Sequence, residues 1–179
     1  APAPLYDSRT GPNVSTTDDL QNGTGLIEAE QEAQIQITDR NDLVPTDATA
    51  AIINITGIQA QDNGFLTAYP CGTTRPTTST LNYQTGTNIA NGATIDIGAG
   101  GKICIYTSAT THLALDITGY IPATSDVETF TPARLYDSRT GPNATTIDDL
   151  QAGDGRIEAE QEAQIQITDR NDLVATEAT

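Results

Sequence analysis

The side chains that could carry out catalysis are few. His112 is the only histidine, and the chain has no G-x-S-x-G turn or other nucleophile motif that would use it as a base. The sequence also has no set of metal ligands or glycine-rich cofactor loop of the kinds found in enzymes. We therefore expect no enzymatic activity and no cofactor, with calcium as the one exception to weigh.

Oxygen ligands suited to calcium gather in one short stretch. Asp39, Asn41, Asp42 and Asp47 lie within nine positions, and calcium prefers carboxylate and amide oxygens. The spacing is not that of an EF-hand loop, which needs a central glycine and a final glutamate. Calcium binding and ordinary Asx turns in a hydrated loop both fit this stretch.

Carboxylates nearer the start could also be read as acid and base. Asp18 and Asp19 are adjacent, and Glu28, Glu30 and Glu32 stand two apart, which would place them on one face of a strand. Charged residues mostly stay in water. A hydrated acidic surface is therefore the interpretation we favour for both groups.

Cys71 and Cys104 are the only cysteines. A disulfide between them would close a loop of 34 residues, worth about 4 kcal/mol in the chain-entropy description. No C-x-x-C spacing or nearby histidine indicates a metal or redox site, so the choice lies between a disulfide and two buried thiols. We expect the disulfide, which implies an oxidising compartment, extracellular or at the cell surface.

A short charged motif occurs twice. Asp7 and Arg9 return as Asp137 and Arg139 within identical stretches, residues 5–13 and 135–143. On a strand, residues two apart share a face, and an arginine can fork onto a carboxylate or onto backbone carbonyls. We expect the motif to fix the first strand in place, with sugar binding as the alternative role.

Four tyrosines offer a second route to sugar binding. Tyr69, Tyr83, Tyr106 and Tyr120 could stack on sugar rings if they gather on one exposed face. Tyrosines also fill cores and sheet edges. Tyrosines can take that role here because the chain has few other aromatic residues, with no Trp and two Phe.

The elements that must position these residues are predicted to be strands. Ala33, Ile35 and Ile37 alternate with polar residues, as do Leu113, Leu115 and Ile117, and period two is typical of a half-buried strand. Further strands are expected over residues 51–55, 65–69, 81–83, 94–97 and 103–106, between Gly- and Asn-rich turns. The fold class is therefore all-β, an antiparallel β-sandwich of jelly-roll or Ig-like type.

The sequence contains a long internal repeat. Residues 5–49 match residues 135–179 at 37 of 45 positions with an offset of 130, and residues 27–44 return unchanged at 157–174. A period of 130 residues is the size of a domain, not of a solenoid turn. The repeat therefore predicts beads in tandem.

Two partitions of the chain fit this period. We favour a complete bead over residues 1–122, a proline-bounded linker over 123–133, and the N-terminal part of a second copy over 134–179. The other takes residues 50–179 as the complete bead. Either way a partial copy would expose unpaired strand edges, so we expect something to complete it.

Composition excludes several classes of partner. The net charge is −16, from 24 acidic and eight basic residues, which repels phosphate backbones and disfavours nucleic acid. No uncharged apolar run approaches the roughly 18 residues of a membrane span. We expect no nucleic-acid partner and no membrane insertion.

Several motifs in order carry a resemblance to a known family. They are LYDSRT (5–10), AIINIT (51–56), GFLTAYPCGTTRP (64–76), LNY (81–83), GAGGKICIY (98–106) and LDITGYIP (115–122). Together they resemble the repeat module of secreted actinomycete-type bacterial proteins, which opens with an R-L-L-D-T-R-like motif and closes near D-V-x-G-Y-F. The resemblance covers nearly all of residues 1–122 and implies an exported protein with tandem modules and no assigned catalytic residues. Tyr6, Ser8 and Ile121 depart from that pattern, as does the acidic stretch 39–47.

These observations predict an extracellular structural or adhesive tandem-repeat module. It would form a stalk, surface fibre or filament, with copies of itself as partners and strand complementation between beads as one means of assembly. The alternative is a carbohydrate-binding module that tethers a secreted hydrolase or the cell to polysaccharide. Tyrosines exposed on one face would favour that alternative.

Overall fold

The computed structural model describes residues 1–129 and 133–170. Within them the chain forms eight strands and no helix. The strands are β1 (Ala3–Asp7), β2 (Glu32–Gln36), β3 (Ala50–Ile58), β4 (Gly64–Pro70), β5 (Leu81–Tyr83), β6 (Asn88–Asp96), β7 (Lys102–Thr107) and β8 (His112–Ile121). The many Thr and Ile residues favour strands, and the 15 glycines and nine prolines disfavour long helices.

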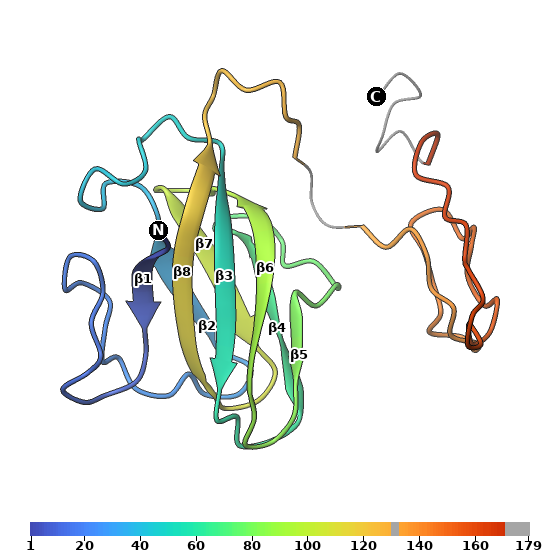
Figure 1. Cartoon of the computed structure of the whole chain (residues 1–179), viewed down its shortest axis with the longest axis horizontal. Helices are drawn as coiled ribbons and strands as arrows, with labels where there is room; N and C mark the ends of the chain where they lie inside the picture. The colour runs from blue at the N-terminus through green and yellow to red at the C-terminus, as the bar shows by residue number, and fades with distance from the viewer. Residues whose placement is uncertain (130–132, 171–179) are drawn as a thin grey trace. The chain divides into compact units, whose positions relative to one another are not determined.

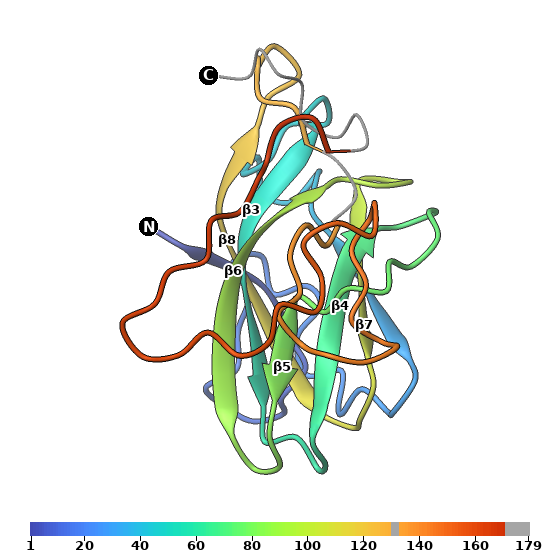
Figure 2. The same ribbon diagram turned by 90° about the vertical axis from the view of Figure 1, so that its right-hand side faces the viewer.

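The strands form two antiparallel sheets of four, in the orders β1-β8-β3-β6 and β2-β7-β4-β5. Figures 1 and 2 show the sheet of β3, β8 and β6 lying against the sheet of β4, β5 and β7. Pairing is nested along the chain, since β1 pairs with β8, β2 with β7, β3 with β6 and β4 with β5. The predicted all-β sandwich is confirmed, and this order is that of a jelly roll.

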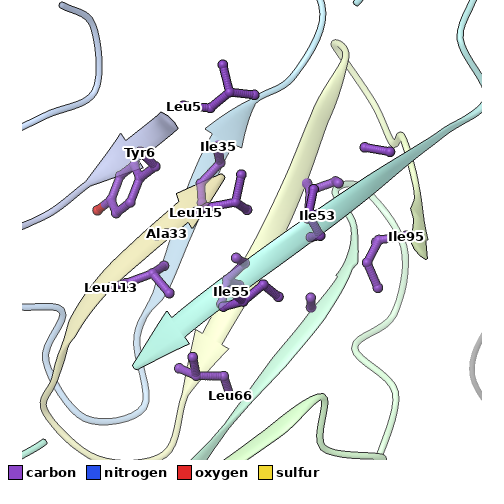
Figure 3. Packing of buried hydrophobic residues seen from close by; sticks show 14 of the residues in the cluster. Leu5, Tyr6, Ala33, Ile35, Ile53, Ile55, Leu66, Ile95, Leu113 and Leu115 are labelled. Atoms are coloured by element: carbon purple, nitrogen blue, oxygen red, sulfur yellow. The ribbon is translucent and has the colours of Figure 1, made fainter. Parts of the chain in front are cut away.

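The core fills the space between the two sheets. Alternation places one face of each strand inward. Side chains from all eight strands converge there, and Figure 3 shows part of this cluster. The labelled members are Leu5, Tyr6, Ala33, Ile35, Ile53, Ile55, Leu66, Ile95, Leu113 and Leu115, all buried. The residues that alternate with them face water or the loops.

The first two strands occupy an edge position in each sheet. β1 lies at one edge and pairs with β8, and β2 lies at an edge of the other sheet and pairs with β7. Residues 3–49, here called the opening segment, therefore supply one edge strand to each sheet. Residues 50–121, here called the body, contain the other six strands.

By its contacts the chain divides into two compact units, Ala1–Thr129 and Phe130–Thr179. The division falls inside the expected linker, of which residues 130–132 lie outside the described residues. The second unit carries the repeat of the opening segment, here called the second opening segment, described over residues 133–170; its predicted remainder, residues 171–179, lies outside the described residues. Its described residues form turns and two isolated bridging positions but no strand.

Candidate functional site: the two opening segments

Arg40 lies at the centre of a polar cluster that holds the opening segment together. Its side chain is 2% exposed. The guanidinium forks onto the carboxylate of Asp18 through Nε and Nη2, and Nη1 donates to Oε1 of Gln21 at 2.8 Å. Three backbone carbonyls complete the set, those of Leu5 at 3.1 Å, Leu20 at 3.1 Å and Gln36 at 3.2 Å.

All partners of the Arg40 cluster lie within the opening segment, between residues 5 and 40. The cluster therefore joins β1, β2 and the loop between them without using the body. Gln21 extends it, since Nε2 donates to the carbonyl of Gln34 at 3.0 Å and Oε1 accepts from the backbone N–H of Gln36 at 2.9 Å. A buried guanidinium is tolerated when its donors are satisfied in this way.

The charge pair in this cluster is electrostatically coupled. The side-chain hydrogen bonds from Arg40 hold the pKa of Asp18 below its ordinary value, against a smaller opposing effect of burial. Asp18 is therefore not the free, hydrated carboxylate expected from its place beside Asp19. The bidentate geometry fixes the orientation of both side chains.

The second opening segment contains the same cluster around Arg170. Its side chain is also 2% exposed, forks onto Asp148 and donates to Oε1 of Gln151. The carbonyl acceptors are again three, Leu135 at 3.0 Å, Leu150 at 3.2 Å and Gln166 at 3.1 Å. Hydrogen bonds from Arg170 lower the pKa of Asp148 to about 2.

The apolar side chains of the two segments differ sharply in burial. Ile35 and Ile37 are 0% exposed, whereas their equivalents Ile165 and Ile167 are 43% and 49% exposed. Ile27 is 8% exposed and its equivalent Ile157 is 45% exposed. The second opening segment thus presents an apolar face to water, formed by residues that the first one buries.

The body supplies the cover for these residues in the first copy. β2 pairs with β7 so that Ala33 faces Ile105 and Ile35 faces Ile103. The backbone of Ile27 exchanges two hydrogen bonds with Thr111, at 2.9 and 3.1 Å. The apolar face of the opening segment is therefore buried by its contacts with the body, and not by contacts within the segment.

The Asp7–Arg9 motif forms the expected fork. Arg9 donates from Nε to Oδ1 of Asp7 at 3.0 Å and from Nη2 to Oδ2 at 2.6 Å, and its backbone N–H donates to Oδ1 at 3.0 Å. Burial raises the pKa of Asp7, but these bonds outweigh it and the net shift is downward. β1 ends at Asp7, so Arg9 is not on the strand as expected and instead folds back over its end.

The repeated motif has the same geometry. Arg139 forks onto Asp137 at 2.9 and 2.6 Å, and Nη1 of Arg134 adds a contact at 3.2 Å. The hydrogen bonds from Arg139 lower the pKa of Asp137 to about 2. The Asp–Arg pair therefore forms in both copies, at the end of β1 in the first and at the equivalent residues in the second.

A polar hollow of about 390 Å³ opens beside the first of these pairs. The outer faces of β1, β8 and β3 form its floor. Its polar lining includes Asp7, Arg9, Asn13, Asn88 and Asp116. Carboxylate, guanidinium and amide groups of this kind can hydrogen-bond a hydroxyl-rich ligand.

Cys71 and Cys104 form a disulfide, as predicted. Cys71 directly follows β4 and Cys104 lies on β7, so the bond joins two neighbouring strand regions of one sheet. Both residues are buried. The bond lies wholly in the body and indicates an oxidising environment for this chain.

The four tyrosines do not share an exposed face. Tyr83 belongs to the core between the sheets, and Tyr69 is buried with its hydroxyl donating to Glu32. The ring of Tyr106 is covered by the guanidinium of Arg75, 3.6 Å from its centroid. Tyr120 is exposed, but it lies on β8 in the other sheet.

The calcium candidates lie in the loop between β2 and β3. Asp39, Asn41, Asp42 and Asp47 are all exposed, and the first three adopt positive φ. Asn and Asp tolerate this conformation better than other residues. In the parts of the chain that the structure describes, no three His, Cys, Asp or Glu side chains are grouped as metal ligands.

His112 and the glutamates take part in local contacts. Nδ1 of His112 lies 3.0 Å from the hydroxyl of the buried Ser8, which ties the start of β8 to the end of β1. Glu30 adopts positive φ and precedes β2. The glutamates at 28, 30 and 32 therefore do not form the strand-borne stripe expected of them.

Sequence reasoning did not find the Arg40 cluster. The signal was present, because the eight differences between the two copies spare Arg40, Asp18 and Gln21. Asp18 and Gln21 precede Arg40 by 22 and 19 positions, so no short motif links the arginine to them. Arg40 lies between Asp39 and Asn41, two of the candidate calcium ligands.

Comparison of the chain with models of known families, with curated proteins and with solved structures gives no match. Among the described residues, no helix is long and apolar enough to cross a membrane.

Proposed function

We propose that this chain is a structural or adhesive tandem-repeat segment of an extracellular stalk, surface fibre or filament. The observation that carries the proposal is the second opening segment, in which the Arg170 cluster repeats the Arg40 cluster at an offset of 130 residues. A period of this length is the size of a domain. It fits a chain in which beads are joined through repeated segments.

Further features support a load-bearing or protective role. The disulfide braces the body, and a bond of this kind persists outside the cell. The charge of −16 keeps neighbouring beads apart in solution. The resemblance to modules of secreted bacterial proteins, stated above from the sequence, agrees with the same location.

Assembly state tests this proposal directly. Negative-stain electron microscopy of protein isolated without denaturant from its natural source is expected to show rows or fibres with an axial period near one bead. Light scattering on the 179-residue chain, over a range of concentrations, then reports whether this segment alone associates. Dispersed single-chain particles in both samples would overturn the proposal.

Carbohydrate binding is a second candidate, favoured by the polar hollow beside Asp7 and Arg9. Its side chains are suited to hydroxyl groups, and no exposed tyrosine platform is required. A glycan array followed by calorimetry tests it, with Asn88→Ala as a variant that removes one polar side chain from the lining of the hollow. Specific binding that the variant weakens would support this role, and no binding across the array would remove it.

A further inference from the structure

A second hollow lies on the outer face of the β1-β8-β3-β6 sheet, next to the polar hollow beside Asp7 and Arg9. Its volume is about 610 Å³. The lining comes mainly from β3, β6 and β8, and includes Ile52, Asn54, Gly92, Thr94, Asp116 and Thr118. Asp116 lines both hollows, so they adjoin on the sheet. Together they are here called the outer groove.

The outer groove follows the direction of β3. Ile52 lines one of its hollows and Ile58 lines the other, and six steps along a strand span about 20 Å. β8 and β6 pair with β3 on either side over this length, as Figure 1 shows. A site of this length suits a linear ligand with repeating units better than a single small molecule.

Two polar side chains without partners meet in the middle of the outer groove. Asn54 of β3 is opposite Asp116 of β8 in the strand register, and both are half-buried. Among the residues that the structure describes, neither side chain has a hydrogen-bond or ion-pair partner. The carboxylate can accept hydrogen bonds, and the amide can both donate and accept them. The pair is therefore available to a ligand.

Gly92 of β6 leaves the second hollow open. It lies opposite Asn54 in a strand whose register is unbroken, and its φ is not positive. A Cβ at this position would have one atom within 4 Å, the carbonyl oxygen of Ile53 at 3.9 Å. Neither the backbone nor the packing therefore requires a glycine. A glycine inside a strand often marks a place where a ligand approaches the backbone.

The chemistry of the lining selects the class of ligand. β3 and β8 have strand partners on both sides, so their backbone groups are used within the sheet, whereas a peptide that binds as an added strand needs a free edge. Acidic polymers are repelled by Asp116 and by the net charge of −16. Hydroxyl groups can pair with Asp116 and Asn54, and Ile52, which is 41% exposed, can pack on the CH groups of a sugar ring.

We propose that the outer groove binds a linear polysaccharide without acidic groups, which runs along β3. Asn88, Asp116 and Asn54 hydrogen-bond its hydroxyl groups in turn. The polar hollow holds one part of the polysaccharide, and the second hollow holds the sugars that follow. This inference rests on the second candidate function, carbohydrate binding, and names its ligand class.

The dependence of affinity on oligosaccharide length tests the groove. Calorimetry on the 179-residue chain uses cello-, manno-, xylo-, malto- and chitosan oligosaccharides, each from the disaccharide to the hexasaccharide. For the series that binds, we expect the hexasaccharide to bind about tenfold or more tightly than the disaccharide, a ratio that corresponds to about 1.4 kcal/mol. Polygalacturonate oligosaccharides, which are acidic, serve as the comparison and are expected not to bind.

Variants of the second hollow show whether the longer ligand occupies it. Gly92→Phe fills this hollow from a position with free space for a side chain, so the hexasaccharide should bind it no more tightly than the disaccharide does. Asn54→Ala should weaken hexasaccharide binding several-fold, at little cost in stability because Asn54 has no side-chain partner to lose. Asn82→Ala is the matched control, since this exposed asparagine lies on β5 in the other sheet, and should leave binding unchanged.

The outcomes separate this inference from the function on which it rests. Equal affinity for all lengths, unaffected by Gly92→Phe and Asn54→Ala but weakened by Asn88→Ala, would uphold sugar binding at the polar hollow and overturn the outer groove. Binding of polygalacturonate alone would overturn the ligand class, and binding of no oligosaccharide would overturn both proposals. If circular dichroism shows that Gly92→Phe is unfolded, Asn54→Ala decides the occupancy of the second hollow.

Discussion

The two opening segments have nearly the same sequence but differ in which of their interactions are complete. Arg40 and Arg170 each donate six hydrogen bonds to five equivalent residues. Ile35 is fully buried, whereas Ile165 is nearly half exposed. The polar cluster is thus a local property of the segment, while apolar burial depends on a body that pairs with it.

Two kinds of interaction stabilise different parts of this jelly roll. Hydrogen bonds within residues 5–40 shape the opening segment by themselves, since a guanidinium with satisfied donors needs no further cover. Hydrophobic stabilisation scales with the area removed from water, so it arises only when both sheets close on the segment. The hydrogen bonds of an opening segment therefore form within the segment, whereas its apolar face is buried only by the body.

The largest expected effect that tests this comparison is at the equivalent isoleucines. Ile35→Ala should lower the free energy of unfolding of the first bead by about 2–5 kcal/mol, because it leaves a cavity between the sheets. Ile165→Ala should change it by less than about 0.5 kcal/mol, since an exposed side chain makes few contacts. Urea denaturation of both variants measures the difference. Equal losses would show that Ile165 is buried in solution.

Loss of the disulfide should come next in size. Cys71→Ala combined with Cys104→Ala is expected to destabilise the bead by about 2–4 kcal/mol through the larger entropy of the unfolded chain. The second opening segment has no cysteine, so amide exchange around Arg170 should be unchanged. Hydrogen exchange read by mass spectrometry checks both expectations. Faster exchange around Arg170 would reveal a dependence of that cluster on the body.

Titration of Asp18 and Asp148 compares the two polar clusters directly. Asp18 and Asp148 both have lowered folded-state pKa values, that of Asp148 near 2. The contribution of Asp148 to stability is therefore complete above the unfolded value of about 3.8 and falls away as the pH drops toward 2. The contribution of Asp18 is likewise lost as the pH falls through its own lowered pKa. NMR titration of the two carboxyl groups should find both below 3.8. A value near 3.8 for Asp148 alone would mean that its cluster does not persist without a body.

The smallest expected effect concerns a contact that the second copy has lost. The hydroxyl of Tyr6 lies 2.8 Å from Oγ1 of Thr24, and Asp154 replaces this threonine in the repeat. Thr24→Ala should lower the stability of the first bead by about 1 kcal/mol. Asp154→Ala, the control, should leave it unchanged in the same denaturation experiment. A larger effect of Asp154→Ala would indicate that Asp154 has found a partner of its own.

Most strand positions could be predicted because apolar residues two apart in the sequence lie on the buried face of a strand. Ala33 and Ile35 point inward on β2, and Ile53 and Ile55 do so on β3, as their spacing indicated. β6 was expected over residues 94–97 but begins at Asn88. Its first five residues are exposed and show no period-two pattern, and they become a strand because β3 pairs with them along its whole length.

The candidate site was less predictable than the fold. The Asp7–Arg9 pair could be proposed because its members are two residues apart. Asp18 and Arg40 are 22 positions apart, and their contact depends on a loop that brings the first strand beside the second. Without that geometry, the acidic residues next to Arg40 fit both calcium binding and ordinary Asx turns.

The period of 130 residues, the all-β class and the cysteine pair could be read from the sequence, because they follow from residue identity, alternation and count. The tertiary structure decided the nested strand order, the burial of Arg40, and which copy of each isoleucine is covered. Those features depend on contacts between positions far apart in the chain. A residue's own type cannot specify them, since the same Ile–Gln–Ile stretch is core in one copy and surface in the other.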